Sequence, residues 1–201
     1  MSSFDDTFGP PPAPDPEAFP ASVRPEWIGP PTDELGCAVP CATVLARNER
    51  AVVGLRALTV FSAGLALDVV AVARGLRPAE ASRVMHEQHA FAPDDDVSPL
   101  MLRIGVTFAD GRRASNLGGH HRLFASGEPP DEPVLFPAGG GGGMSSGTDV
   151  SLQPSYWLWP LPPGDELRLA CEWPALDLPF REHVLDAAAL REAAARSLPL
   201  W

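Results

Sequence analysis

The chain has 201 residues, 45% of them hydrophobic, which is enough length and apolar content for one globular domain. Its formal net charge of −11 argues against nucleic acid as a main partner and equally against docking on an anionic membrane, because both surfaces bind basic patches. The N-terminal residues lack the pattern of a secretory signal, and no apolar run approaches the ~20 residues of a spanning helix. We therefore expect a cytoplasmic protein.

Residues 1–35 are acidic and rich in proline, with no apolar periodicity. Each proline removes a backbone donor and disfavours helix in the residue before it. We therefore predict a disordered tail over 1–35, in which Trp27 and Ile28 are the residues suited to packing onto the domain. The domain itself is predicted over residues 36–201.

From Cys41 the pattern changes to that of strands. Residues 41–47 are strand-like, and residues 51–62 and 64–74 predict two strands about a turn in which Gly64 takes the left-handed conformation. In the second of these strands one apolar face alternates with a mixed face. The apolar face consists of Leu65, Leu67, Val69, Ala71 and Ala73.

A short helix is predicted over residues 78–90, with Pro78 near its start. An alternating strand follows at 101–108, and Asp110-Gly111 directly after it is the strongest hairpin signal in the chain. Residues 117–147 read as irregular, with a flexible loop at the five glycines 139–143.

Three more strands are predicted near the end of the chain, at 148–161, 165–173 and 180–185, and a helix capped by Asp186 follows them. About seven or eight short strands with frequent turns and two short helices predict a mainly β fold, an antiparallel immunoglobulin-like sandwich.

The stretch YWLWPLPPGDELRLACEWPALDLP, with the closing helix, resembles a set of uncharacterised bacterial proteins from high-GC genomes. The segments GLALDVVAVAR and LRIGVTFADGRRASN share this resemblance more loosely. The resemblance implies an immunoglobulin-like sandwich and carries over no activity and no site residue.

Trp157, Trp159 and Trp173 are the sharpest candidate site. Trp157 and Trp159 fall on one side of a predicted strand, and Trp173 ends the next strand on its apolar face. Flat aromatic rings on a sandwich face can stack against sugar rings, so one hypothesis is a carbohydrate- or ligand-binding surface. The alternatives are a protein interface and packing in the core, and the core is the more frequent role of tryptophan in sandwiches.

Four histidines suggest a second hypothesis, a metal-dependent hydrolase; they are His86, His89, His120 and His121. Histidines and nearby aspartates are the ligand types of a zinc site, but HEQH departs from the HExxH spacing. Gly143–Gly147 matches the G-x-S-x-G elbow formally, without the strand-to-helix turn that the elbow requires. Cys37, Cys41 and Cys171 are too few and too scattered for a disulfide framework.

No cofactor is predicted, and the oligomeric state is left open. Because no set of catalytic side chains converges in the pattern, the leading hypothesis is a non-enzymatic β-sandwich. It would serve as a binding or structural module for a protein or small ligand that the sequence does not identify.

Overall fold

A computed structural model describes residues 24–88, 98–117, 128–139 and 142–201. Of these residues 47% lie in strands and 13% in helices, which confirms the predicted mainly β fold with antiparallel sheets and two short α-helices. Residues 24–35 were predicted to belong to the disordered tail, but they pack on the domain around the buried Trp27. The rest of the predicted tail lies outside the described residues.

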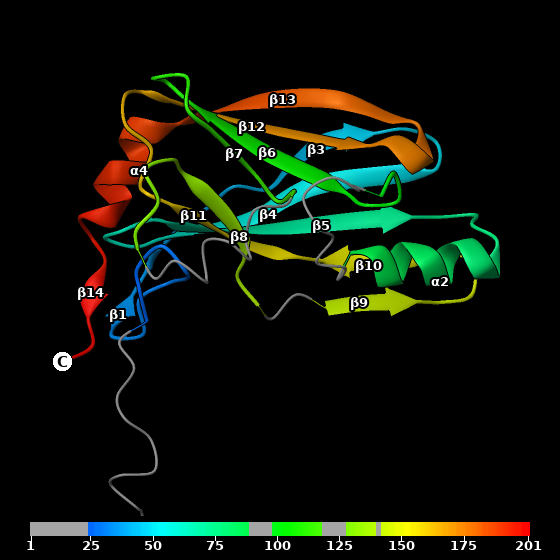
Figure 1. Cartoon of the computed structure of the whole chain (residues 1–201), viewed down its shortest axis with the longest axis horizontal. Coiled ribbons are helices and arrows are strands. Elements are labelled where there is room, and N and C mark those ends of the chain that lie inside the picture. The colour runs from blue at the N-terminus through cyan, green and yellow to red at the C-terminus, as the bar shows by residue number, and fades with distance from the viewer. Residues whose placement is uncertain (1–23, 89–97, 118–127, 140–141) are drawn as a thin grey trace, which may run out of the picture.

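The larger sheet, here called sheet B, is built on an antiparallel pair of long strands, β4 (Ala51–Val60) and β5 (Leu65–Ala73) (Figure 1). The free side of β4 pairs with β2 (Cys37–Val39) and β3 (Thr43–Arg47). The free side of β5 pairs with β11 (Ser155–Trp159) and β10 (Val150–Gln153), whose own outer neighbours are β8 (Val134–Pro137) and β9 (Gly142–Ser145).

The smaller sheet, sheet C, has the order β13-β12-β6-β7. Its strands are β6 (Arg103–Phe108), β7 (Arg113–Ser115), β12 (Glu166–Trp173) and β13 (Leu178–Asp186). The 3-10 turn η1 (Pro174–Leu176) joins β12 to β13. A two-stranded ribbon, β1 (Glu34–Leu35) with β14 (Leu198–Pro199), brings the first and last described strands together at one end of the domain (Figure 1).

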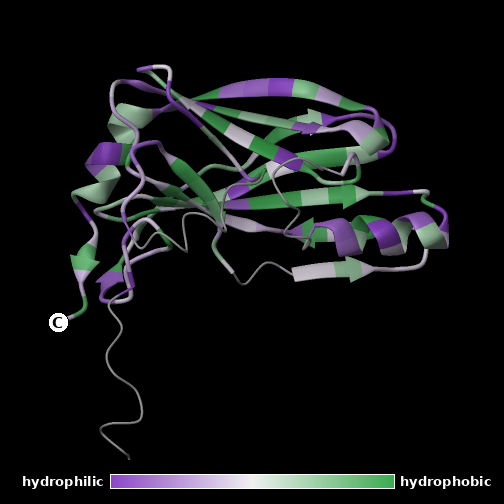
Figure 2. Ribbon diagram, in the orientation of Figure 1, coloured by the Kyte–Doolittle hydropathy of each residue, from purple (hydrophilic) through white to green (hydrophobic). Residues whose placement is uncertain are grey.

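Apolar side chains fill the space between the two sheets, and along the strands they alternate with solvent-facing side chains as predicted. On β5, the five residues of the apolar face are fully buried. On β12, Leu167, Leu169 and Trp173 are also fully buried, while Glu166 and Arg168 point to solvent. Figure 2 shows hydrophobic residues along β5 and hydrophilic stretches on β13 and α2. Alternation with period two thus decides which face of each sheet meets the core.

The two helices begin where the sequence predicts. Helix α2 (Pro78–Glu87) has proline in its first turn, and α4 (Ala187–Ala194) is capped by Asp186, whose Oδ1 accepts from the Ala189 N–H at 2.9 Å. Helix α4 contacts β2, β4 and β12, so it closes one end of the sandwich (Figure 1).

Two predicted glycine turns have different outcomes. Gly111 has φ of +89° in the β6–β7 turn, which confirms the hairpin signal. Gly64 does not adopt a positive φ, so its predicted left-handed conformation is wrong. A Cβ at position 64 would collide with the Leu158 carbonyl oxygen, which means that close approach of β11 requires this glycine.

Two further segments differ from the prediction. Residues 148–161, predicted as one strand, are split at Pro154 into β10 and β11, which pair with different halves of β5. Proline cannot donate to a ladder, and the Pro154 carbonyl instead accepts from the Val69 N–H at 2.9 Å. The region 117–147, predicted as irregular, contains β8 and β9, and Gly142 and Gly143 belong to β9 rather than to a loop.

Asn116 ties the two sheets together from inside the core, where it is 4% exposed. Its Oδ1 accepts from the Ile104 N–H at 2.8 Å, and its Nδ2 donates to the Leu102 carbonyl at 2.9 Å. The same Nδ2 lies 3.3 Å from the hydroxyl of Tyr156, on β11 of the opposite sheet. The amide therefore satisfies one backbone group in β6 and one directly before it that would otherwise be buried without partners.

Replacing this amide is expected to destabilise the domain. Asn116→Ala leaves the Ile104 N–H and the Leu102 carbonyl unpaired in the core, and we expect the free energy of unfolding to fall by about 2–4 kcal/mol in urea denaturation. Tyr156→Phe removes only the longest of the three hydrogen bonds of the Asn116 amide, and it should lower the free energy of unfolding by less than about 1 kcal/mol. A loss below about 0.5 kcal/mol in Asn116→Ala would contradict this role.

Candidate functional site

The tryptophans of β11 lie on the outer face of sheet B. Trp157 and Trp159 share one side of the strand, as predicted, and Tyr156 and Leu158 face the main core. However, Trp157 is fully buried, because the side chain of Trp27 from the N-terminal segment packs over it with Val134 and Phe136. The Trp157 indole N–H donates to the Glu26 carbonyl at 2.9 Å and so helps to hold that segment in place.

Trp173 lies elsewhere, in the core between the sheets. Its side chain is fully buried and its indole N–H donates to the Leu100 carbonyl at 2.8 Å. Trp159 alone of the three predicted platform residues is half-buried. The three indoles therefore form no common exposed surface, and a sugar-stacking platform made of them does not exist in this fold.

The predicted histidine site falls mostly outside the described residues. His86 is exposed on α2, whereas His89, His120 and His121 are not among the residues that the structure describes. Within the described ranges, no three His, Cys, Asp or Glu side chains are grouped so as to hold a metal ion. His183, which the sequence analysis did not single out, places its Nε2 2.7 Å from the Leu45 carbonyl oxygen and links β13 to β3.

Two of the three cysteines, Cys41 and Cys171, are poor candidates for a nucleophile. All three are free thiols, and burial, with a smaller effect of the Glu172 carboxylate, raises the pKa of Cys171 to about 11. Burial and the charge of Asp68 also raise the pKa of Cys41. A thiol with a raised pKa stays protonated at neutral pH and is a poor nucleophile.

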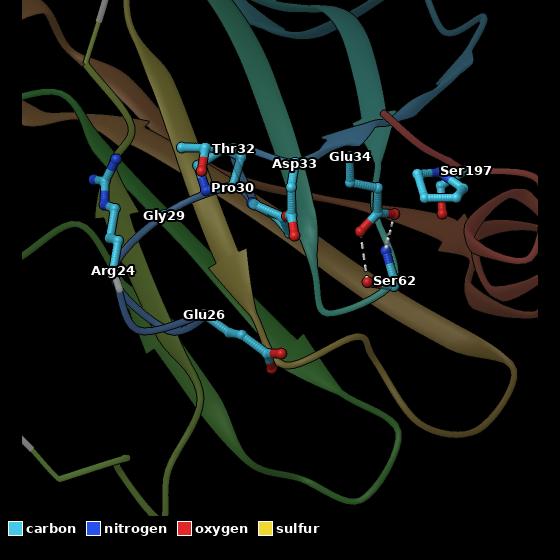
Figure 3. Close-up of a pocket in the computed structure, with 11 residues that line it drawn as sticks. Arg24, Glu26, Gly29, Pro30, Thr32, Asp33, Glu34, Ser62 and Ser197 are labelled. Carbon is cyan, nitrogen blue, oxygen red and sulfur yellow. Dashed lines mark hydrogen bonds between the residues drawn. The ribbon is translucent and has the colours of Figure 1, made fainter. Parts of the chain in front are cut away.

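A first hollow, of about 740 Å³, lies where the N-terminal segment meets β14 (Figure 3). Glu34 lies at its wall and accepts from the Ser62 N–H at 2.7 Å and from the Ser62 hydroxyl at 2.6 Å. Partial burial by itself raises the pKa of Glu34, but hydrogen bonds from Ser197 and Ser62 outweigh it and hold the pKa below its usual value. The two bonds from Ser62 join the N-terminal segment to the β4–β5 turn, and we call this pair of bonds the Glu34 latch.

A second hollow lies on the outer face of sheet C and measures about 450 Å³. Register pairs Ser115 with Gly105, Gly105 with Ala170, and Ala170 with Glu182, so one row runs across all four strands. Its two central positions carry almost no side chain, and they form the floor of the hollow. Phe180 of β13, 56% exposed, stands at one side.

Sequence reasoning did not find this hollow. The outward positions of β6 and β12 were identified by their alternation, but the small residues there carried no signal by themselves. Only the register shows that Gly105 and Ala170 are direct neighbours. The exposed Phe180 was visible as an aromatic residue in a strand, but its outward direction depends on the irregular register near the end of β12.

No family model matches this chain, and no curated protein or solved structure is significantly similar to it. Among the described residues, no helix is long and apolar enough to cross a membrane.

The cover that Trp27 places over Trp157 can be tested by fluorescence quenching. In a Trp201→Phe background, which removes an indole that is 94% exposed, Trp27→Ala should make the remaining indoles more accessible to acrylamide. Lost packing should also reduce the free energy of unfolding by about 3 kcal/mol. Leu35→Ala, at an exposed position, is the control and should change neither quantity. Unchanged quenching in Trp27→Ala would show that the cover is not formed in solution.

The Glu34 latch predicts a pH dependence of stability. A carboxyl whose pKa is lowered by folding stabilises the folded state above its unfolded pKa of about 4.3, and this contribution is lost as the pH falls through the folded pKa. Glu34→Gln should therefore reduce the difference in thermal stability between pH 7 and pH 3, by less than about 1 kcal/mol because the group is partly solvated.

Asp33→Asn is the matched control for this latch, since it leaves both bonds of Ser62 to Glu34 in place. If Glu34→Gln and the unsubstituted chain lose stability equally between pH 7 and pH 3, the latch contributes nothing.

Proposed function

We propose that this chain is a non-enzymatic, immunoglobulin-like binding module whose contact site is the hollow over Gly105 and Ala170. Strand order supports the immunoglobulin-like assignment. The order β4-β5-(β10, β11)-(β8, β9) in sheet B corresponds to A-B-E-D of that fold, and β7-β6-β12-β13 in sheet C corresponds to C′-C-F-G. The two strands β2 and β3 are additions at the edge of β4.

Binding rather than a purely structural role is supported by the contrast between the outer faces of the two sheets. The aromatic residues on sheet B are covered by Trp27. On sheet C, Phe180 and Val184 remain more than half exposed, and Phe180 lines a hollow in which no described segment lies. Large apolar side chains that stay open to solvent next to a hollow are typical of contact sites.

The observation that carries the proposal is Gly105. A Cβ there would have only the Ala114 carbonyl oxygen at 3.5 Å and the Ser115 Cβ at 3.9 Å as near neighbours, which are ordinary contacts. Neither packing nor a positive φ requires glycine at this position. Glycine inside a strand costs about 0.5–1 kcal/mol relative to alanine, so its presence keeps the hollow open at the expense of stability.

The free thiols bear on location. Cys37, Cys41 and Cys171 are all unpaired, which supports a reducing compartment and agrees with the cytoplasmic location expected from the sequence.

The proposal predicts that one substitution at Gly105 raises stability and that a larger one abolishes binding. Gly105→Ala should raise the free energy of unfolding by about 0.5–1 kcal/mol. Gly105→Val should fold and fill the hollow. In a ligand-observed NMR screen of a general fragment library against the full chain, hits should be lost in Gly105→Val and in Phe180→Ser.

Val184→Ser is the matched control for this screen. It removes an apolar side chain of similar exposure from the same strand, outside the lining of the hollow, and should keep the hits. An absence of hits, or hits that are indifferent to both hollow variants, would refute the proposed site.

A further inference from the structure

The hollow on sheet C has two chemically different ends. Phe180 belongs to β13, at one edge of the sheet, and Arg113 to β7, at the other edge. Register places Arg113 in the row of Thr107, Arg168 and Val184, and Phe180 lies four residues before Val184 on β13. Three strand spacings across the sheet and about four residues along it therefore separate the two backbones, roughly 19 Å on the diagonal. The floor of Gly105 and Ala170 lies between them, so the long side chains at both ends can reach one small molecule that lies diagonally across the floor.

Arg113 supplies a positive charge that no described carboxylate neutralises. The other arginines facing outward from sheet C have partners: Arg103 binds Glu172 at 2.7 Å, and Arg168 binds Glu166 and Glu182, both at 3.1 Å. In the neighbouring turn, Arg112 binds Asp110 at 2.9 Å. Arg113 is exposed and makes no ion pair with any described residue.

The rest of the lining fits a polar end and an apolar end. Register pairs Arg113 with Thr107, and Ser115 is the next outward residue of β7, so two hydroxyls accompany the guanidinium. At the other end the ring of Phe180 offers an apolar surface, and the carboxylate of Glu182, which lines the hollow there, is paired with Arg168, an arginine that also binds Glu166. The volume of about 450 Å³ lies within the range of sites for small molecules.

We infer that the hollow binds a small planar anion, with its aromatic or similarly flat apolar body over Gly105, Ala170 and Phe180 and its acidic group on Arg113. This inference rests on the proposed function and names its ligand class. Guanidinium binds carboxylate, sulfonate and phosphate groups through charge-assisted hydrogen bonds. The overall charge of −11 does not prevent this, because charges more than about 8 Å away are largely screened at physiological ionic strength.

Two fluorescent probes test the inference. 8-Anilinonaphthalene-1-sulfonate has the proposed shape and charge, and N-phenyl-1-naphthylamine is its neutral counterpart without the sulfonate. Titrated into the folded full chain at neutral pH, the anionic probe should bind at one site and more tightly than the neutral probe. Phe180→Ser should lower the affinity for both probes. Arg113→Gln should lower the affinity for the anionic probe roughly three- to tenfold and leave the affinity for the neutral probe unchanged.

Two matched controls keep the result specific. Val184→Ser removes an apolar group from the same face, and Arg181→Gln removes an exposed arginine from the same strand as Phe180; neither lines the hollow, and neither should change binding. Circular dichroism of each variant shows that the fold is retained.

The outcomes separate this inference from the function on which it rests. If both probes bind equally well and both are lost in Phe180→Ser, the hollow is a binding site and the anionic class is wrong. If neither Phe180→Ser nor Gly105→Val affects either probe, the site and the ligand class both fail. Loss of binding in Trp201→Ser alone would place the probe on the exposed C-terminal residues and would overturn the inference as well.

Discussion

The inner faces of β5 and β12 exclude water from the space between the two sheets, and this packing positions the other elements of the domain. Burial of an apolar face fixes strand register, because a slip by one residue would turn that face toward solvent. Asn116 sits inside the same space and satisfies the backbone beside β6. With register fixed in this way, the outward residues of sheet C line up into the row that contains the hollow.

The two outer faces of the sandwich meet solvent differently. Sheet B carries a second apolar cluster around Trp157, and residues 24–28 cover it with Trp27 and Ile28. Sheet C carries Phe180 and Val184 without such a cover among the described residues. A chain that covers one apolar outer face and leaves the other open has an asymmetry that stability alone does not explain, and this asymmetry underlies the proposed binding role.

Much of the fold followed from local pattern. The alternation in β5 and β12, the Asp110-Gly111 turn and the Asp186 cap are each set by neighbours in the sequence, and each was predicted. The role of Gly64 was not, because it depends on the close approach of β11, which is more than ninety residues away. The tryptophans of β11 were placed on the right side of their strand, but their burial by Trp27 is a contact between distant segments. The hollow was missed for the same reason, since it arises from small residues on separate strands.

The pairing of β1 with β14 has a consequence for how the domain would be attached to a neighbouring polypeptide. The backbone N–H of Leu200 donates to the Asp33 carbonyl at 2.8 Å, so residues near both ends of the described chain are hydrogen-bonded neighbours. A polypeptide attached beyond β1 or beyond β14 would join the domain at the same end. The sandwich would then project sideways from the attached polypeptide and would not extend it end to end. Tension along such a chain would act first on the segment around Trp27, on the short ribbon and on the Glu34 latch, while the strands around the hollow would bear little of the load.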